Sequence, residues 1–189
     1  MRTVVLLSGG LDSMVLAEEL RLAGDLAGCV FVDYGHPAQI QEGWRAFAYC
    51  GSRSVRLKVV HAFGIDLGDM GTSVGARIVH ARNSILVALA ANATRSLGGD
   101  SLAIGAIADD QADYEDCRPS FLAAMQAATG VQVVAPLIGA SKADVVARAR
   151  VIGLDLDLSW SCYGPGPDPC GVCPSCVQRA TATGWGGGR

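Results

Sequence analysis

The sequence predicts an α/β protein built on a doubly wound, mainly five-stranded parallel sheet. Short runs of β-branched and aliphatic residues alternate with longer segments rich in Ala, Leu and Arg, the pattern of parallel strands joined by helical crossovers. The first run, Val4 to Leu7, is apolar throughout and therefore indicates a strand buried between helices on both faces. Half of the 189 residues are hydrophobic and 24 are glycine, which suits tightly turned layers of this kind.

The expected strands and helices follow one another in regular order. The strands are Thr3 to Leu7, Cys29 to Val32, Val55 to Val60, Leu102 to Ile104 and Val131 to Val134. The helices are Ser13 to Ala23, Gln39 to Cys50, Asn83 to Leu97, Pro119 to Thr129 and Lys142 to Ile152. Glycines stand where helix ends need a positive φ, at Gly24, Gly98, Gly130 and Gly153. Ligands of such folds gather at the carboxyl ends of the strands, where the winding reverses, so functional motifs should meet at one edge.

The chain divides into a main domain over 1–153, a C-terminal segment over 154–180 and a flexible tail over 181–189. Two zones inside the main domain, 61–78 and 106–118, fall outside the regular alternation. The first is Gly-rich and is predicted to be a surface loop without a catalytic role. The tail is predicted from its run of glycines.

Composition narrows the classes of partner. The formal net charge is -3, so we expect no broad basic face and no direct binding of nucleic acid. The N-terminus carries no secretory signal pattern, and the apolar stretches are too short to span a membrane. We therefore expect a cytoplasmic protein without a membrane partner.

A phosphate-binding loop is predicted between the first strand and the first helix. Two glycines let the backbone point successive N–H groups inward toward an anion at the helix N-terminus. Asp12 would cap the helix or hold Mg²⁺ against pyrophosphate. An ordinary capped turn is the alternative, but the loop lacks the Lys of a Walker loop and the third glycine of a dinucleotide site. It resembles the pyrophosphate loop of the N-type ATP pyrophosphatases, and its residues are Ser8, Gly9, Gly10, Leu11, Asp12 and Ser13.

Four cysteines near the C-terminus have the spacing C-x7-C-x2-C-x2-C. They are Cys162, Cys170, Cys173 and Cys176. Four thiolates suit a closed tetrahedral site, so we expect one structural Zn²⁺ that secures this segment and activates no water. An iron–sulfur cluster, disulfides and unpaired thiols are the alternatives, of which disulfides are disfavoured in a reducing compartment.

Taken together, the motifs resemble the 7-cyano-7-deazaguanine synthases, in the same order along most of the chain. Besides the loop and the cysteines, they comprise Asp33-Tyr34-Gly35, Ala81-Arg82-Asn83, Asp116-Cys117-Arg118-Pro119, Ala135-Pro136-Leu137 with Lys142, Ser159-Trp160-Ser161-Cys162-Tyr163, and Arg179. The resemblance implies an adenine nucleotide alpha hydrolase-like fold. It also implies that ATP and ammonia convert 7-carboxy-7-deazaguanine to the nitrile through an adenylated carboxylate and an adenylated amide, releasing AMP and pyrophosphate.

The resemblance also implies roles for individual residues. The loop would hold pyrophosphate, with Mg²⁺ accompanying ATP, while Arg82, Asn83 and Lys142 would face ATP or the transition state. Asp12, Arg82 and Lys142 are the catalytic candidates; for Lys142, a solvated helix-start lysine is an equal alternative. A deazapurine edge would be read by Asp110, Asp116, Arg118 and His36, although a solvated loop is nearly as good an account of the first three. Cys117 is assigned a packing role.

Some departures from the family pattern keep other functions open. His36-Pro37 replaces the usual sequence after Asp-Tyr-Gly, and the 61–78 segment is short. A diverged ligase that stops at the amide, or joins the deazaguanine to another amine such as a protein, is one alternative. A catalytically silent zinc module is the second. The resemblance leaves a homodimer open as well.

Overall fold

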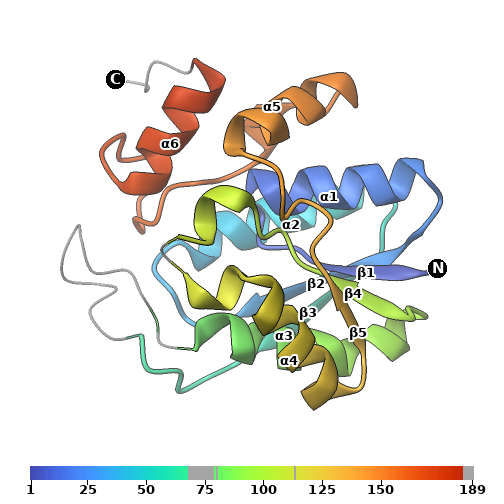
Figure 1. Cartoon of the computed structure of the whole chain (residues 1–189). Coiled ribbons are helices and arrows are strands. Elements are labelled where there is room, and N and C mark those ends of the chain that lie inside the picture. Colours follow the sequence, from blue (N-terminus) through green and yellow to red (C-terminus); the bar gives the residue numbers. More distant parts are fainter. Residues whose placement is uncertain (68–78, 80, 113, 185–189) are drawn as a thin grey trace.

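The computed structural model describes residues 1–67, 79, 81–112 and 114–184 (Figure 1). Its strands are β1 (Thr3–Leu6), β2 (Leu26–Asp33), β3 (Leu57–His61), β4 (Ser101–Ala103) and β5 (Gln132–Val134). Its α-helices are α1 (Leu11–Leu22), α2 (Gln39–Ser52), α3 (Arg82–Thr94), α4 (Pro119–Thr129), α5 (Lys142–Val151) and α6 (Pro174–Thr183). Short 3₁₀ turns follow α3 and β4, precede α4, and follow α5.

The strands form one parallel sheet in the order β3-β2-β1-β4-β5. The order runs outward from β1 in both directions, so the winding reverses between β1 and β4. The predicted doubly wound, five-stranded sheet is therefore confirmed. A crevice is expected outside the carboxyl ends of β1 and β4.

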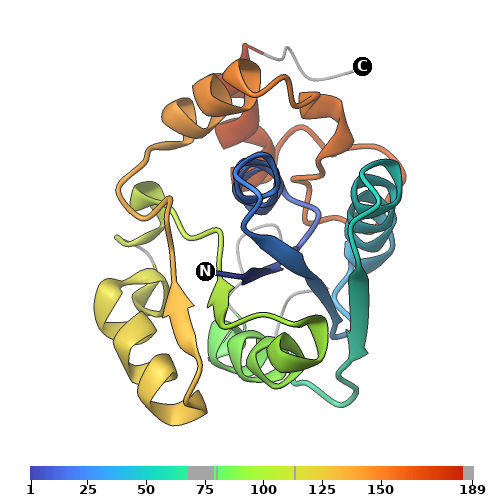
Figure 2. The same cartoon turned by 90° about the vertical axis from the view of Figure 1, so that its right-hand side faces the viewer.

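Helices cover both faces of the sheet (Figures 1 and 2). Side chains of α1, α2 and α5 pack with Val5, Leu7 and Phe31 in one core cluster. Side chains of α3 and α4 pack with Val4 and Val30 in another. Successive residues of β1 enter opposite clusters, because side chains alternate across a strand. This is why an uninterrupted apolar run is needed there.

The boundaries of the elements differ from the sequence predictions mainly where contacts with an adjacent strand determine where an element begins. β2 begins at Leu26 rather than Cys29, and it runs through Gly28. A Cβ on Gly28 would lie 3.1 Å from the carbonyl oxygen of Arg56, so the glycine permits close packing of β2 against the residue that precedes β3. The four helix-end glycines all have φ between 67° and 78°, as predicted.

The C-terminal segment contains a helix that the sequence did not predict. α6 packs beside α5 and extends to Thr183, so it includes the first residues assigned to the tail (Figure 1). Residues 185–189 of that tail, and 68–78 of the predicted 61–78 loop, lie outside the described residues. In the described part of the chain, no helix has the length and apolar character needed to cross a membrane.

Candidate active site and cysteine cluster

A cavity of about 260 Å³ lies at the carboxyl edge of the sheet. Its walls come from the predicted phosphate loop, from Ile104 and Gly105 after β4, from the N-termini of α2, α3 and α5, and from the segment around Trp160. α6 contributes Ser175, Gln178 and Arg179. The crevice expected at the reversal point is therefore present, and it gathers residues from both ends of the chain.

The phosphate loop is held by hydrogen bonds between its two serines. The Ser13 hydroxyl lies 3.1 Å from that of Ser8 and accepts from the Ser8 backbone N–H at 3.2 Å. Ser8 Oγ in turn accepts from Gly10 N, and Ser13 Oγ donates to Gly10 O. The loop is thus preorganised at the start of α1, where N–H groups and the helix dipole favour an anion.

Two glycines let other parts of the chain touch this loop. Gly9 has φ of 79°, and a Cβ there would lie 2.4 Å from the carbonyl oxygen of Glu42 in α2. A Cβ on Gly105 would lie 2.9 Å from the backbone nitrogen of Ser13. Gly105 thus lets the end of β4 meet the start of α1, a contact that no local sequence signal revealed.

Asp12 and Lys142 form an ion pair inside the cavity. Lys142 Nζ lies 2.8 and 2.6 Å from the two carboxylate oxygens of Asp12, and the side chains are 15% and 21% exposed. The helix-capping role considered for Asp12 is wrong, because Asp12 lies within α1, whose N-cap is Gly10 without a side-chain cap. Lys142 is likewise not a solvated surface lysine; it starts α5 and points at the phosphate loop.

Arg82 and Asn83 begin α3 and line the same cavity. Burial opposes the charge of Arg82, but Tyr34, Tyr163 and Asp116 outweigh it and raise the pKa of its guanidinium. Arg82 is therefore a cation at neutral pH. Asn83 donates through its backbone N–H to Asp116 Oδ2 at 3.2 Å, and its side-chain amide lies 3.3 Å from Asp116 O.

The predicted substrate residues are dispersed. Asp110 lines the cavity, and burial followed by the charge of Asp12 raises its pKa. The Asp116 carboxylate accepts a hydrogen bond from the Asn83 backbone N–H. Arg118 donates to Gln111 O at 3.0 Å and forms an ion pair with Glu115. His36 is 4% exposed and stacks on Tyr34. The last three are not among the described residues that line the cavity.

Cys117 is buried in the core cluster under α3, in line with its predicted packing role. It also borders the cavity. Burial, then the charges of Asp110 and Asp116, raises the pKa of its thiol to about 12. A thiol with such a pKa is not an activated nucleophile at neutral pH.

Several cavity residues received no role from the sequence. They are Tyr34, Trp160, Tyr163 and Glu42. Tyr34, Trp160 and Tyr163 stand within the motifs that carry the family resemblance, so a signal for them existed. Glu42 stands in none of those motifs, so no sequence signal pointed to it.

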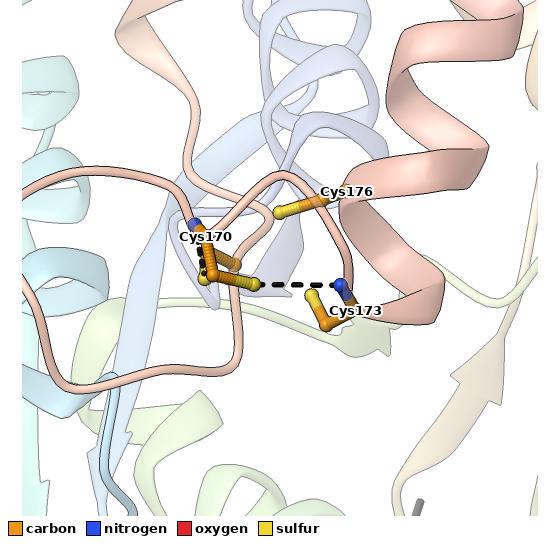
Figure 3. A group of neighbouring side chains, drawn as sticks. Cys170, Cys173 and Cys176 are labelled. Atoms are coloured by element: carbon orange, nitrogen blue, oxygen red, sulfur yellow. Dashed lines mark hydrogen bonds between the residues drawn. The ribbon is translucent and has the colours of Figure 1, made fainter. Parts of the chain in front are cut away.

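The four predicted cysteines converge. Their Sγ atoms all lie within 4.8 Å of one another, and Figure 3 shows Cys170, Cys173 and Cys176 turned toward a common point. Sulfurs around a tetrahedral zinc, with Zn–S near 2.3 Å, stand about 3.8 Å apart, so the cluster has the size such a site needs. Gly164 N and Cys170 N donate to Cys162 Sγ at 3.3 Å, and Cys173 N donates to Cys170 Sγ at 3.4 Å. Such donors favour thiolates, the form that binds metal.

The cysteine cluster is connected to the phosphate loop. The Trp160 indole donates to Cys162 O at 2.7 Å, and Trp160 N donates to Gly9 O at 2.9 Å. From α6, Arg179 donates to Ser159 Oγ at 2.7 Å and to Leu156 O at 2.6 Å. A metal in the cluster would thus fix one wall of the cavity as well as the C-terminal segment.

Comparisons of sequence place the chain among known proteins. The profile described as "Queuosine biosynthesis protein QueC" matches residues 63–184. The 7-cyano-7-deazaguanine synthase of Rhizorhabdus wittichii is 37% identical, over 95% of this chain and 89% of that protein. The protein of the same name from Koribacter versatilis is 35% identical, over 96% of this chain and 88% of its own.

Solved structures share the fold at low sequence identity. The U34-tRNA thiolase NcsA from Methanococcus maripaludis, with its [4Fe-4S] cluster, superposes with a TM-score of 0.59 at 19% identity. The match covers 97% of this chain and 63% of the thiolase chain. NMN synthetase from Francisella tularensis gives 0.57 at 13% identity, over 89% and 69% of the two chains. These likenesses establish the fold alone.

Proposed function

The chain belongs to the 7-cyano-7-deazaguanine synthase family, and from this membership we propose that it converts 7-carboxy-7-deazaguanine to 7-cyano-7-deazaguanine with ATP and ammonia. The proposal makes the chain an AMP- and pyrophosphate-forming ligase. The observation that carries it is the meeting of the phosphate loop, Lys142 and Arg82 in one cavity at the reversal point of the sheet. An amide-forming or protein-conjugating relative is disfavoured, because the relatives found over most of the chain carry the name of the nitrile-forming enzyme.

The chemistry begins at the phosphate loop. The β- and γ-phosphates would lie on the loop N–H groups at the start of α1, which places the α-phosphorus toward the substrate. A carboxylate oxygen of the deazaguanine attacks the α-phosphorus, and pyrophosphate leaves. Lys142 and Arg82 are cations positioned where negative charge develops, and the preformed Asp12 pair holds Lys142 in place. Mg²⁺, when bound with ATP, would neutralise the pyrophosphate that leaves, and Asp12 is the residue proposed to face it.

Ammonia then attacks the acyl carbon and AMP leaves, which gives the amide. The amide oxygen attacks the α-phosphorus of a second ATP, pyrophosphate leaves again, and loss of AMP with two protons yields the nitrile. Zinc would be held by the four cysteines without an open position, so it takes no part in these steps. Its proposed contribution is to order the segment around Trp160, which lines the cavity.

Product analysis tests the proposal. Purified protein is incubated with 7-carboxy-7-deazaguanine, MgATP and ammonium, and products are identified by mass spectrometry. We expect nitrile with two AMP and two pyrophosphate per molecule. Amide as the final product with one AMP would favour the diverged ligase, and no turnover would overturn the proposal.

A further inference from the structure

Three carboxylates line the cavity among the described residues, and they are not equivalent. Asp12 is paired with Lys142. Asp110 lies within the field of that pair, as the effect of Asp12 and Lys142 on its pKa shows. Glu42, in the first turn of α2 and near Tyr34, makes no hydrogen bond or ion pair with either residue of that pair in the described part of the chain. Glu42 is therefore the cavity carboxylate that is not engaged by the Asp12–Lys142 pair.

Glu42 is held by a buried histidine. His36 Nε2 lies 2.9 Å from Glu42 Oε2, and the His36 ring stacks on Tyr34 with centroids 4.4 Å apart and 16° between planes. His36 Nδ1 has no hydrogen-bond partner in the described part of the chain. The proton of a neutral His36 therefore belongs on Nε2, where it is donated to Glu42. This leaves Glu42 Oε1 without a hydrogen bond from the described residues.

The backbone of Glu42 is fixed as well. Its carbonyl is in close contact with Gly9 of the phosphate loop, so α2 cannot shift along the cavity without moving that loop. The start of α2 also favours a negative side chain through the helix dipole. The cavity thus presents a preorganised carboxylate at a set distance from the place where phosphate binds.

Deazaguanine and adenine differ in how well their hydrogen-bonding edges match a carboxylate. A deazaguanine presents adjacent N–H donors, from N1 and the 2-amino group, and a carboxylate accepts two parallel hydrogen bonds. Adenine presents an acceptor beside its 6-amino donor, which a carboxylate does not match. Three aromatic residues, Tyr34, Trp160 and Tyr163, are among those that line the same cavity.

We propose that Glu42 recognises the N1–H and 2-amino edge of the deazaguanine, and that His36 is the positioning residue that orients its carboxylate. This inference rests on the proposed function. It assigns to Glu42 the recognition of the substrate edge that the sequence predicted for Asp110, Asp116 and Arg118.

The test compares two ligands on five proteins by calorimetric binding. The ligands are 7-carboxy-7-deazaguanine and the analogue with hydrogen in place of the 2-amino group. The proteins are the wild type, Glu42→Gln, Asp110→Asn, His36→Phe, and the acid-to-amide control Asp25→Asn, whose partly exposed carboxylate meets the N-terminus at the opposite edge. ATP binding and the thermal midpoint are recorded for each.

The wild type and the Asp25→Asn control should bind the amino ligand about 10- to 100-fold more tightly than the analogue, the effect of one charge-assisted hydrogen bond. Glu42→Gln should reduce that preference to about threefold or less, with ATP binding unchanged. His36→Phe keeps a ring against Tyr34 and removes the donor, so it should reduce the preference about threefold to tenfold. It also serves as the second variant if Glu42→Gln does not fold.

Retention of the preference in Glu42→Gln, or its loss in Asp110→Asn alone, would overturn the inference. So would an effect of Glu42→Gln confined to ATP or Mg²⁺ binding. A wild type that binds neither ligand rejects the proposed function itself, and that outcome is distinct from loss of discrimination in one variant.

Discussion

Single residues decide whether the phosphate loop can form. Gly9 combines a positive φ with backbone contact to α2, whereas Gly24 has the same φ with no atom within 4 Å of an added Cβ. Alanine substitution would therefore introduce backbone strain at both positions, but a steric clash only at Gly9. The strain of a left-handed alanine costs about 1–2 kcal/mol at either position.

We predict that Gly9→Ala abolishes ATP-dependent pyrophosphate release, with at least about a hundredfold loss, because Glu42 or the loop must move. Gly24→Ala should lower the thermal midpoint by a few degrees and leave turnover unchanged. Steady-state pyrophosphate release and thermal unfolding measure both effects. Equal loss of turnover in the two variants would mean that strain alone, and not the contact with Glu42, is responsible.

Lys142 gives a second prediction at this scale. Lys142→Met keeps the length of the side chain but removes the charge beside the α-phosphate, so kcat should fall about 10²- to 10³-fold. Lys58→Met is the matched control, since Lys58 is the other lysine of the chain and hydrogen-bonds only Ser96 among the described residues. If kcat of Lys142→Met stays within about threefold of the wild type, Lys142 has no role in the transition state.

At the scale of elements, α1 and α2 are joined by a buried carboxylate. Glu18 is 5% exposed and accepts from Arg21, Tyr49 and Arg53 at 2.8–3.0 Å. Burial alone would raise the pKa of Glu18, but the three hydrogen bonds outweigh it and lower the pKa below its usual 4.5. A lowered folded-state pKa stabilises the protein above the unfolded value, and this contribution is lost as the pH falls through the folded value.

Glu18→Gln should therefore lower the free energy of unfolding by about 2–3 kcal/mol at pH 7, the usual worth of hydrogen bonds to a charged group. The difference from the wild type should shrink as the pH falls below about 4.5. Urea unfolding at several pH values measures it, with the exposed Glu115→Gln as control. A difference that does not vary with pH would show that the charge of Glu18 is not what stabilises the pair.

The elements themselves were predictable to different degrees. Runs of aliphatic and β-branched residues identified the five strands, and the Ala-, Leu- and Arg-rich segments identified five α-helices. The strand signal is strongest in β1, whose residues are buried between helices on both faces, although β3 was also found and is largely exposed. α6 was missed because Pro174 to Thr183 is rich in Ser, Thr and Cys, which are poor helix formers. Its stability comes from packing on α5 and from Arg179, which binds the 156–161 segment. Such tertiary support leaves no periodic signal.

At the scale of the molecule, the site joins parts of the chain that no local pattern connects. Asp12 and Lys142 meet across 130 positions, and only the reversal of winding between β1 and β4 brings them together. The motif order predicted that both would serve ATP, but not that they pair. The placement of Arg118 away from the cavity, and of Glu42 within it, depends on helix orientation that sequence spacing does not encode.

The metal prediction belongs to this scale as well. One zinc per chain should be found by elemental analysis, and its removal by a chelator should release the segment around Trp160 from the phosphate loop.

Tryptophan fluorescence measures this release. In a Trp44→Phe, Trp185→Phe background, Trp160 is the remaining tryptophan of three. Chelation should shift its emission to the red, since its buried indole becomes exposed. The KM for ATP should rise before the main domain unfolds. Unchanged emission after complete zinc loss would contradict this coupling.

Transfer of oxygen from substrate to AMP tests the central claim most directly. The two carboxylate oxygens of 7-carboxy-7-deazaguanine are labelled with ¹⁸O, and the AMP and pyrophosphate formed with ATP and ammonium are weighed by mass spectrometry. If the carboxylate and then the amide oxygen attack the α-phosphorus, each AMP carries one ¹⁸O and the pyrophosphate carries none. Unlabelled AMP, or label in the pyrophosphate, would contradict adenylylation at this site.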